Sequence, residues 1–165
     1  MVTPPTVPSA NAVADYVLGL IDPDAGDSIT NLKMQKLLYY VQGWHLALLN
    51  RPAFRERIEA WAKGPVVPTL WRRFYDDSNW GVIDPTKLKT KPMKELPGDT
   101  RHVIDDVWFR YGDFQGSQLQ HMTHKEDPWV DARADALPGE RSSAVITNDA
   151  MKKYFKSRLK NVTHK

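Results

Sequence analysis

Two histidines and two acidic residues lie close together near the end of the sequence. His121 and His124 are three residues apart, and Glu126 and Asp127 follow them. On a helix this spacing places both imidazoles on one face, as in a weak metal-binding pair. A structural or catalytic metal site needs a third and usually a fourth ligand, and no cluster elsewhere in the chain supplies one. We therefore favour a turn in which His124 hydrogen-bonds locally, and we expect no metal site.

Other catalytic chemistries lack the residues or the spacing that they need. The chain has no cysteine, which excludes disulfide scaffolds, zinc ribbons, iron–sulfur clusters and thiol catalysis. Its glycines are isolated and form no phosphate-binding loop. The serines occupy cap or turn positions rather than a nucleophile elbow, and the adjacent acids Asp105 and Asp106 do not face each other. We expect neither an enzyme nor a cofactor.

Basic residues gather in two regions of a chain whose net charge is only +3, too small to demand nucleic acid. Residues 81–96 contain prolines and four lysines and are typical of an exposed connector: Lys87, Lys89, Lys91 and Lys94. The stretch after Asp149 is basic and contains no acid. It suits either phosphate contacts, which makes DNA an alternative partner, or the solvated face of a terminal helix.

The strongest periodic segment spans residues 30–49 and predicts the central helix. Thr30 is suited to cap it, and the following residues repeat at intervals of three and four to form an apolar stripe: Met34, Leu37, Leu38, Val41, Trp44, His45 and Leu48. We expect a more polar opposite face: Lys33, Lys36, Tyr40, Gly43 and Ala47. Lys36 is suited to a structural clasp, with its stem over aromatic rings and its ammonium on a carboxylate.

The remaining pattern predicts a mainly α fold, a compact bundle of about six helices. Further helices are expected near residues 11–21, 67–75, 99–114, 117–122, 127–136 and 147–160. A small two-stranded β element is a candidate near residues 54–62 and 80–83. We expect residues 1–9, which are rich in proline, to be a flexible segment, and residues 10–165 to be a single domain.

Composition places the chain among soluble proteins. Of its 165 residues, 41% are hydrophobic and 26% are charged, a balance that favours a folded globule over disorder. No apolar stretch approaches the roughly 20 residues needed to cross a bilayer. The N-terminus has neither a basic start nor an apolar run, unlike a secretion signal. We expect a cytoplasmic protein with no membrane partner.

Three segments, taken in order, resemble the Panacea domain, a phage-associated (GepA-like) family. They are ITNLKMQKLLYYVQGWHL at 29–46, IEAWAKGPVVP at 58–68 and LQHMTHKEDPW at 119–129. The third segment departs from the family, which more often has Leu-Ser before its Thr-His. The motif residues are Lys33, Lys36, Leu37, Tyr39, Tyr40, Trp44, His45, Trp61, Gly64, Pro65, His124, Pro128 and Trp129.

The resemblance implies an antitoxin from a bacterial or prophage toxin–antitoxin pair. Such proteins bind a cognate protein toxin that is encoded nearby, and they are neither enzymes nor cofactor carriers. A DNA-binding autoregulator and a proteolytic adaptor for the toxin are the alternatives. We expect the motif to be mainly structural, with a contact face around Lys33, Lys36, Tyr40 and His45 as the other interpretation. The candidate toxin contacts are then the exposed lysines Lys87, Lys89, Lys91 and Lys94.

Overall fold

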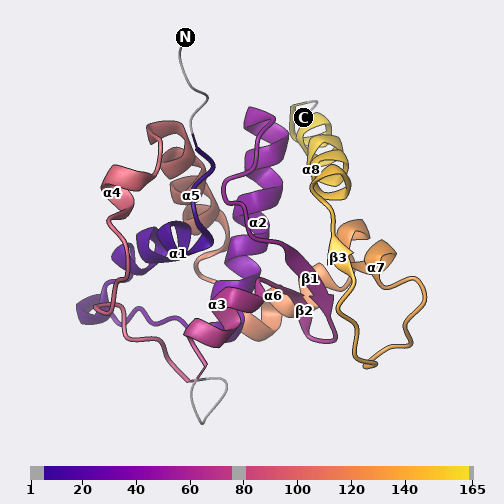
Figure 1. Cartoon of the computed structure of the whole chain (residues 1–165), viewed down its shortest axis with the longest axis horizontal. Helices are drawn as coiled ribbons and strands as arrows, with labels where there is room; N and C mark the ends of the chain where they lie inside the picture. The colour runs from indigo at the N-terminus through magenta and orange to yellow at the C-terminus, as the bar shows by residue number, and fades with distance from the viewer. Residues whose placement is uncertain (1–5, 76–80, 164–165) are drawn as a thin grey trace.

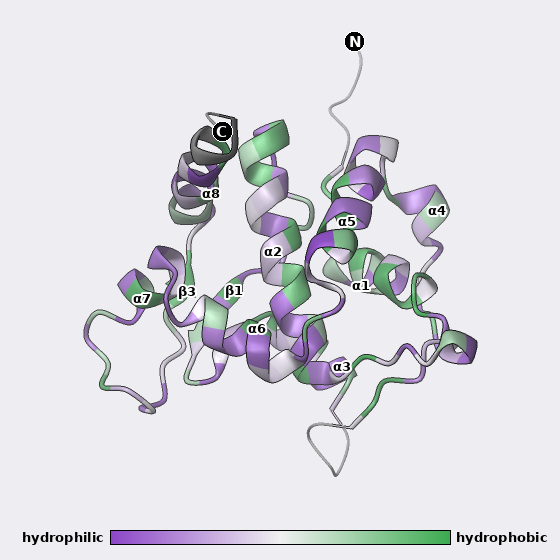
Figure 2. Cartoon of the chain, turned by 180° about the vertical axis from the view of Figure 1, so that it is seen from behind, coloured by the Kyte–Doolittle hydropathy of each residue, from purple (hydrophilic) through white to green (hydrophobic). Residues whose placement is uncertain are grey.

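The computed structural model describes residues 6–75 and 81–163 and is mainly α, as the sequence predicts. The helices surround a long central one, and a small sheet lies beside it (Figure 1). Apolar and polar residues are interspersed along α5 (Gly98–Tyr111) and along the coloured part of α8 (Asn148–Thr163) (Figure 2). The helices are α1 (Ala10–Gly19), η1 (Pro23–Ala25, a 3-10 turn), α2 (Asn31–Leu49), α3 (Pro68–Arg73), α4 (Pro92–Glu95), α5 (Gly98–Tyr111), α6 (Gly116–Thr123), α7 (Asp127–Ala132) and α8 (Asn148–Thr163).

Helix α2 is the centre of the fold. The Thr30 hydroxyl accepts a hydrogen bond from the Lys33 amide at 3.2 Å, which confirms the predicted cap. Asn50 ends the helix in the left-handed region with φ 58°. Helices α5, α6 and α8 all pack against α2, and all but three of its residues are buried.

The polar face that we expected on α2 is therefore wrong. Lys33, Lys36, Tyr40 and Gly43 are buried because α5, α6 and α8, all distant in sequence, cover the helix. Gly43 is the point of closest approach, since a Cβ there would lie 2.1 Å from the ring of Phe155 on α8. At the far end Leu48, which we assigned to the apolar stripe, is exposed.

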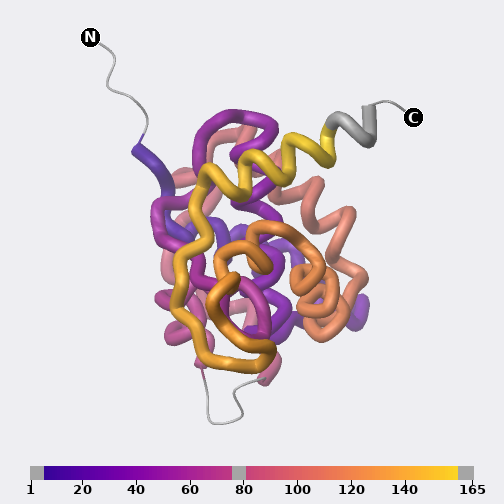
Figure 3. The backbone as a smooth tube through the Cα atoms, turned by 90° about the vertical axis from the view of Figure 1, so that its right-hand side faces the viewer, coloured from indigo at the N-terminus to yellow at the C-terminus, as the bar shows by residue number. Residues whose placement is uncertain are grey.

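The β element has three strands, β1 (Ile58–Trp61), β2 (Gly64–Val66) and β3 (Val145–Ile146), all antiparallel in the order β2-β1-β3. The predicted strand near 54–62 is confirmed, whereas its predicted partner at 80–83 is wrong. Val82 instead forms an isolated bridge with Thr30, and Trp80 lies outside the described residues. A turn at residues 62–63 brings β2 back along β1. The chain reaches β3 just before it enters α8, the yellow helix of Figure 3.

The connector at residues 81–96, which we expected to be exposed, is exposed only in part. It contains α4 and ends at Leu96, which is buried. At the other end of the chain, Val7 and Pro8 accept hydrogen bonds from Arg55, and Ser9 caps α1. Within the described ranges, no helix combines the length and hydropathy required to cross a membrane.

Candidate functional site

Three of the predicted motif residues, Lys36, Gly64 and Pro65, meet where α2 packs against the sheet. The Lys36 side chain is fully buried, and its Nζ donates a hydrogen bond to the carbonyl of Pro65 at 3.0 Å. Lys36 therefore binds β2, an edge strand of the sheet. The prediction that its ammonium group contacts a carboxylate is wrong. Burial lowers the pKa of Lys36 to about 7, because a low-dielectric interior disfavours the charged ammonium. Gly64 allows this packing: its φ is +109°, and a Cβ there would lie 2.6 Å from Cε of Lys36.

Lys33 is held in a similar way one turn earlier. Its Nζ donates to the carbonyl of Gly112 and lies 5.3 Å from the ring centre of Trp108. Burial lowers the pKa of Lys33. Neither motif lysine is therefore displayed to a partner, which weighs against a contact face around Lys33 and Lys36.

Tyr39 and Tyr40 converge on one carboxylate. Their hydroxyls donate to the two oxygens of Glu126, each at 2.9 Å. Burial raises the pKa of Glu126, although the two hydroxyls oppose the shift. The ring of Tyr40 also stacks on Tyr111 at 4.1 Å. These contacts tie α2 to the start of α7 and to α5.

Trp44, His45 and Leu37 of the motif also make their contacts inside the fold. His45 bridges the carbonyl of Arg51 at 2.6 Å and the hydroxyl of Thr100 at 2.8 Å. The indole of Trp44 donates to the hydroxyl of Tyr111 at 3.0 Å. Leu37 is buried in the core. Each of these groups holds α2 to a neighbouring segment.

The region around His124 joins α7 to the sheet. The His124 ring stacks on Trp129 at 4.1 Å, and the Trp129 indole donates to the carbonyl of Trp61 at 2.8 Å. Burial lowers the pKa of His124, and Lys36 adds to this effect. Pro128 occupies the first turn of α7, where a missing amide costs nothing. Among the residues that the structure describes, no group of three His, Asp or Glu side chains is placed to hold a metal ion.

A different surface presents charge outward. We call residues 84–95, which run over α1, the lysine strap. All four of its lysines are exposed (Lys87, Lys89, Lys91 and Lys94), as are the apolar side chains of Leu88 and Met93. A cavity of about 640 Å³ lies between the strap and α1.

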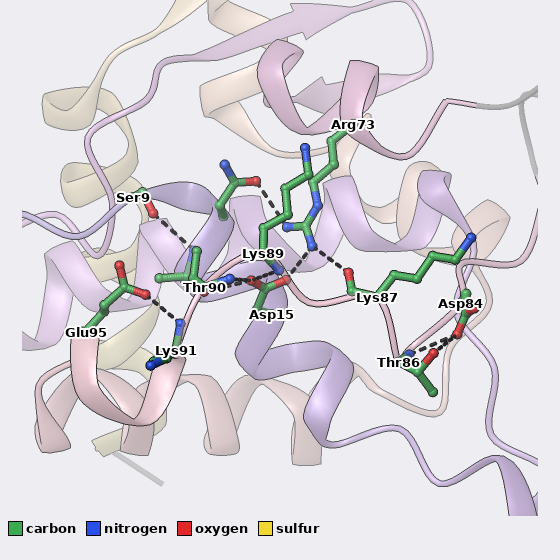
Figure 4. A network of polar contacts seen from close by, with 12 residues as sticks. Ser9, Asp15, Arg73, Asp84, Thr86, Lys87, Lys89, Thr90, Lys91 and Glu95 are labelled. Atoms are coloured by element: carbon green, nitrogen blue, oxygen red, sulfur yellow. Dashed lines mark hydrogen bonds and ion pairs between the residues drawn. The ribbon is translucent and has the colours of Figure 1, made fainter.

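A buried carboxylate fixes the lysine strap to the body of the protein (Figure 4). Asp15 of α1 is fully buried and forms an ion pair with Arg73 of α3. Its second oxygen accepts from the amides of Lys89 and Thr90 at 3.0 and 2.8 Å and from the Thr90 hydroxyl at 2.7 Å. Arg73 also donates to the carbonyl of Lys87 at 3.2 Å. The strap backbone is thus held in place while its lysine side chains point into solvent.

Sequence reasoning missed the residues that form this anchor. An aspartate inside the apolar helix near 11–21 was the available signal, because a buried carboxylate requires partners. Gln35 was missed as well: its Oε1 accepts from the Val67 amide at 2.9 Å, just beyond β2.

The second basic region lies on α8, where Lys153 and Arg158 are exposed while Met151 and Phe155 are buried.

Comparisons with known proteins agree on one family. Residues 34–130 match the family model described as antitoxin SocA-like, Panacea domain. The antitoxin SocA of Caulobacter vibrioides (strain NA1000 / CB15N) is 30% identical over 130 residues, which cover 73% of this chain. The chain spans 65% of the length of that relative. No solved structure matches significantly.

Proposed function

Because this chain belongs to the SocA-like family of Panacea-domain proteins, we propose that it is an antitoxin that neutralises a protein toxin by direct binding. The family match over residues 34–130 is the observation that carries this proposal. The partner is a cognate toxin encoded nearby, and the encounter takes place in the cytoplasm. The protein acts without catalysis or cofactor.

The lysine strap is the proposed contact surface for the toxin. Four exposed ammonium groups beside exposed Leu88 and Met93 suit an acidic protein surface with apolar side chains of its own. Because Asp15 already orders the strap backbone, binding does not have to order it again, and this lowers the entropic cost of association. The charges speed the encounter and make binding sensitive to salt.

The motif residues around Lys36 act as the scaffold for this surface. The polar groups of Lys36, Tyr39, Tyr40 and His45 are hydrogen-bonded to Glu126, to Thr100 and to backbone carbonyls rather than presented outward. Specificity for one toxin then lies on exposed segments such as the strap, and the motif maintains the fold that displays it.

Co-expression with the neighbouring gene product tests the proposal. The product should arrest growth alone, and this chain should restore growth and co-purify with it. A chain that neither rescues growth nor binds the product contradicts the proposal. Toxin half-life, measured in the same cells, distinguishes binding alone from delivery to a protease.

Charge reversal tests the surface. Replacing all four strap lysines with glutamate should leave the circular dichroism spectrum unchanged and abolish rescue. The matched control places the same number of glutamates on α8, at Lys152, Lys153, Lys156 and Arg158. Loss of rescue in the α8 variant alone would place the contact on α8 instead, and a promoter mobility-shift assay on that variant tests the DNA alternative.

A further inference from the structure

A second hollow lies over one face of the small sheet. Side chains two residues apart on a strand share a face, so Glu59 and Trp61 of β1 point the same way. Their cross-strand neighbours are Val66 and Gly64. Glu59, Trp61 and Val66 line a cavity of about 520 Å³ that no strap residue lines. Gly64 leaves this part of the sheet without a side chain, and the stem of Lys36 fills the space.

The walls of this cavity are largely aromatic and apolar. Trp71 of α3 meets Trp61 edge to face, with ring centres 6.0 Å apart. Leu32 of α2 and Val66 of β2 complete the apolar lining. Both indoles are half-buried, so each offers part of a ring to a molecule in the cavity. The volume falls within the range of small-molecule sites, about 300–1,000 Å³.

The charges around the cavity are mainly positive. Lys63 and Arg141 line it and are exposed, and the buried Lys36 lines it as well. Glu59 is the one acid among the lining residues, and both of its oxygens are engaged. Arg57 Nε donates to one at 2.6 Å and the Trp61 indole to the other at 2.9 Å.

Hydroxyl groups stand on the wall next to Arg141. Ser142 and Ser143 precede β3 and border the cavity. The Ser142 oxygen accepts from the Ala144 amide at 3.2 Å, which leaves its own proton available for donation. The exposed lining residues Lys63, Arg141 and Ser143 form the rim of the cavity, and half-buried indole rings belong to the same lining. This arrangement suits a flat apolar body that carries one anionic group.

We propose that this cavity binds a small aromatic carboxylate, with its ring against Trp61 and Trp71 and its carboxylate on Lys63 and Arg141. The site is independent of the proposed antitoxin function and of the strap. A ligand held here touches β1, β2, α3 and the segment before β3 at once, so it would stabilise the sheet and its surroundings.

Calorimetric titration of the full chain with indole-3-acetate tests the site, with indole-3-acetamide as the uncharged match. The acid should bind saturably at one site, about five- to tenfold more tightly than the amide, since each partly exposed ion pair contributes modestly. No saturable binding of the acid, or equal binding of acid and amide, would overturn the proposal.

Two variants separate the ring contact from the charge contact. Exchanging both Lys63 and Arg141 for glutamine should weaken acid binding to the level of the amide and leave amide binding unchanged. The matched control, Lys153→Gln with Arg158→Gln on α8, should bind the acid like the wild type. Trp71→Ala should weaken acid and amide alike, with circular dichroism to confirm folding. Acid binding that survives the rim substitutions overturns the charge assignment.

The outcome is distinct from that of the toxin experiment. The strap charge-reversal variant should bind indole-3-acetate with wild-type affinity, and the rim variant should still restore growth. A protein that binds the acid but fails to rescue growth would refute the antitoxin proposal alone. A protein that rescues growth but ignores the acid would refute this cavity assignment alone.

Discussion

Replacing Asp15 with alanine should detach the lysine strap and destabilise the whole protein. Asp15 accepts four hydrogen bonds, from Arg73, from the amides of Lys89 and Thr90 and from the Thr90 hydroxyl. Removing one partner of a buried ion pair costs about 3–5 kcal/mol, since the other charge is left uncompensated. That is a large share of a typical stability of about 5–15 kcal/mol. For a chain of this size we expect the melting temperature to fall by about 6–20 °C.

Urea unfolding and amide hydrogen exchange measure the two parts of this effect. The free energy of unfolding should fall by the amount above, and the amides of Lys89 and Thr90 should lose their protection. The control is Asp106→Ala, because Asp106 is exposed on α5 and substitutions at such positions stay within about 0.5 kcal/mol. A loss below about 1 kcal/mol in Asp15→Ala, or unchanged exchange at both amides, would refute the anchor.

Three further perturbations test the core. Gly43→Ala should lower the free energy of unfolding by at least about 1–3 kcal/mol through overpacking, because the added methyl group would lie 2.1 Å from the ring of Phe155. A variant as stable as the wild type in thermal melts would contradict the contact between α2 and α8. Lys36 binds fewer protons when folded than when unfolded, so the free energy of unfolding should rise between pH 7 and pH 10 by up to about 1.4 kcal/mol per pH unit. Urea unfolding of Lys36→Met should lack this rise, and an equal rise in both proteins would contradict the assignment. Trp44→Ala should lower the free energy of unfolding by about 3–5 kcal/mol. Trp61→Ala should lower it less, because Trp44 is buried and Trp61 is only half-buried. The reverse order in denaturant unfolding would show that the sheet contributes more to stability than the core around α2.

Local signals were sufficient to place most helices. Thr30 supplies the N-cap of α2 and apolar residues follow at helical spacing, so both the start and the length of this helix could be predicted. Pro68 and Pro128 mark the first turns of α3 and α7 in the same way. These signals operate within one or two turns of the chain, which is the range over which sequence patterns are informative.

Features that depend on distant segments could not be predicted. The polar side of α2 is buried because α5, α6 and α8 pack against it, and no local pattern reveals helices that lie so far along the chain. The pairing of β1 with Val145 and Ile146 is hidden for the same reason. The residues around Lys36 favour a carboxylate partner, whereas in the fold its ammonium group donates to the Pro65 carbonyl instead.

The candidate contact surface was predictable in composition but not in form. Four lysines within eight residues indicated an exposed basic segment. The partners that hold this segment could not be identified from local patterns, since Asp15, Arg73 and Thr90 come from three separate parts of the chain. An aspartate in an apolar helix indicates that it has partners, but only the tertiary structure shows which groups these partners are.

The packing of Phe155 against Gly43 has a consequence for folding during translation. Helix α2 is translated before α8, and the Phe155 ring that packs against Gly43 is translated more than a hundred residues after that glycine. Until then that flank of α2 stays uncovered and open to chaperones and proteases. Translation that stops before α8 should therefore yield a short-lived fragment rather than a weakly active one.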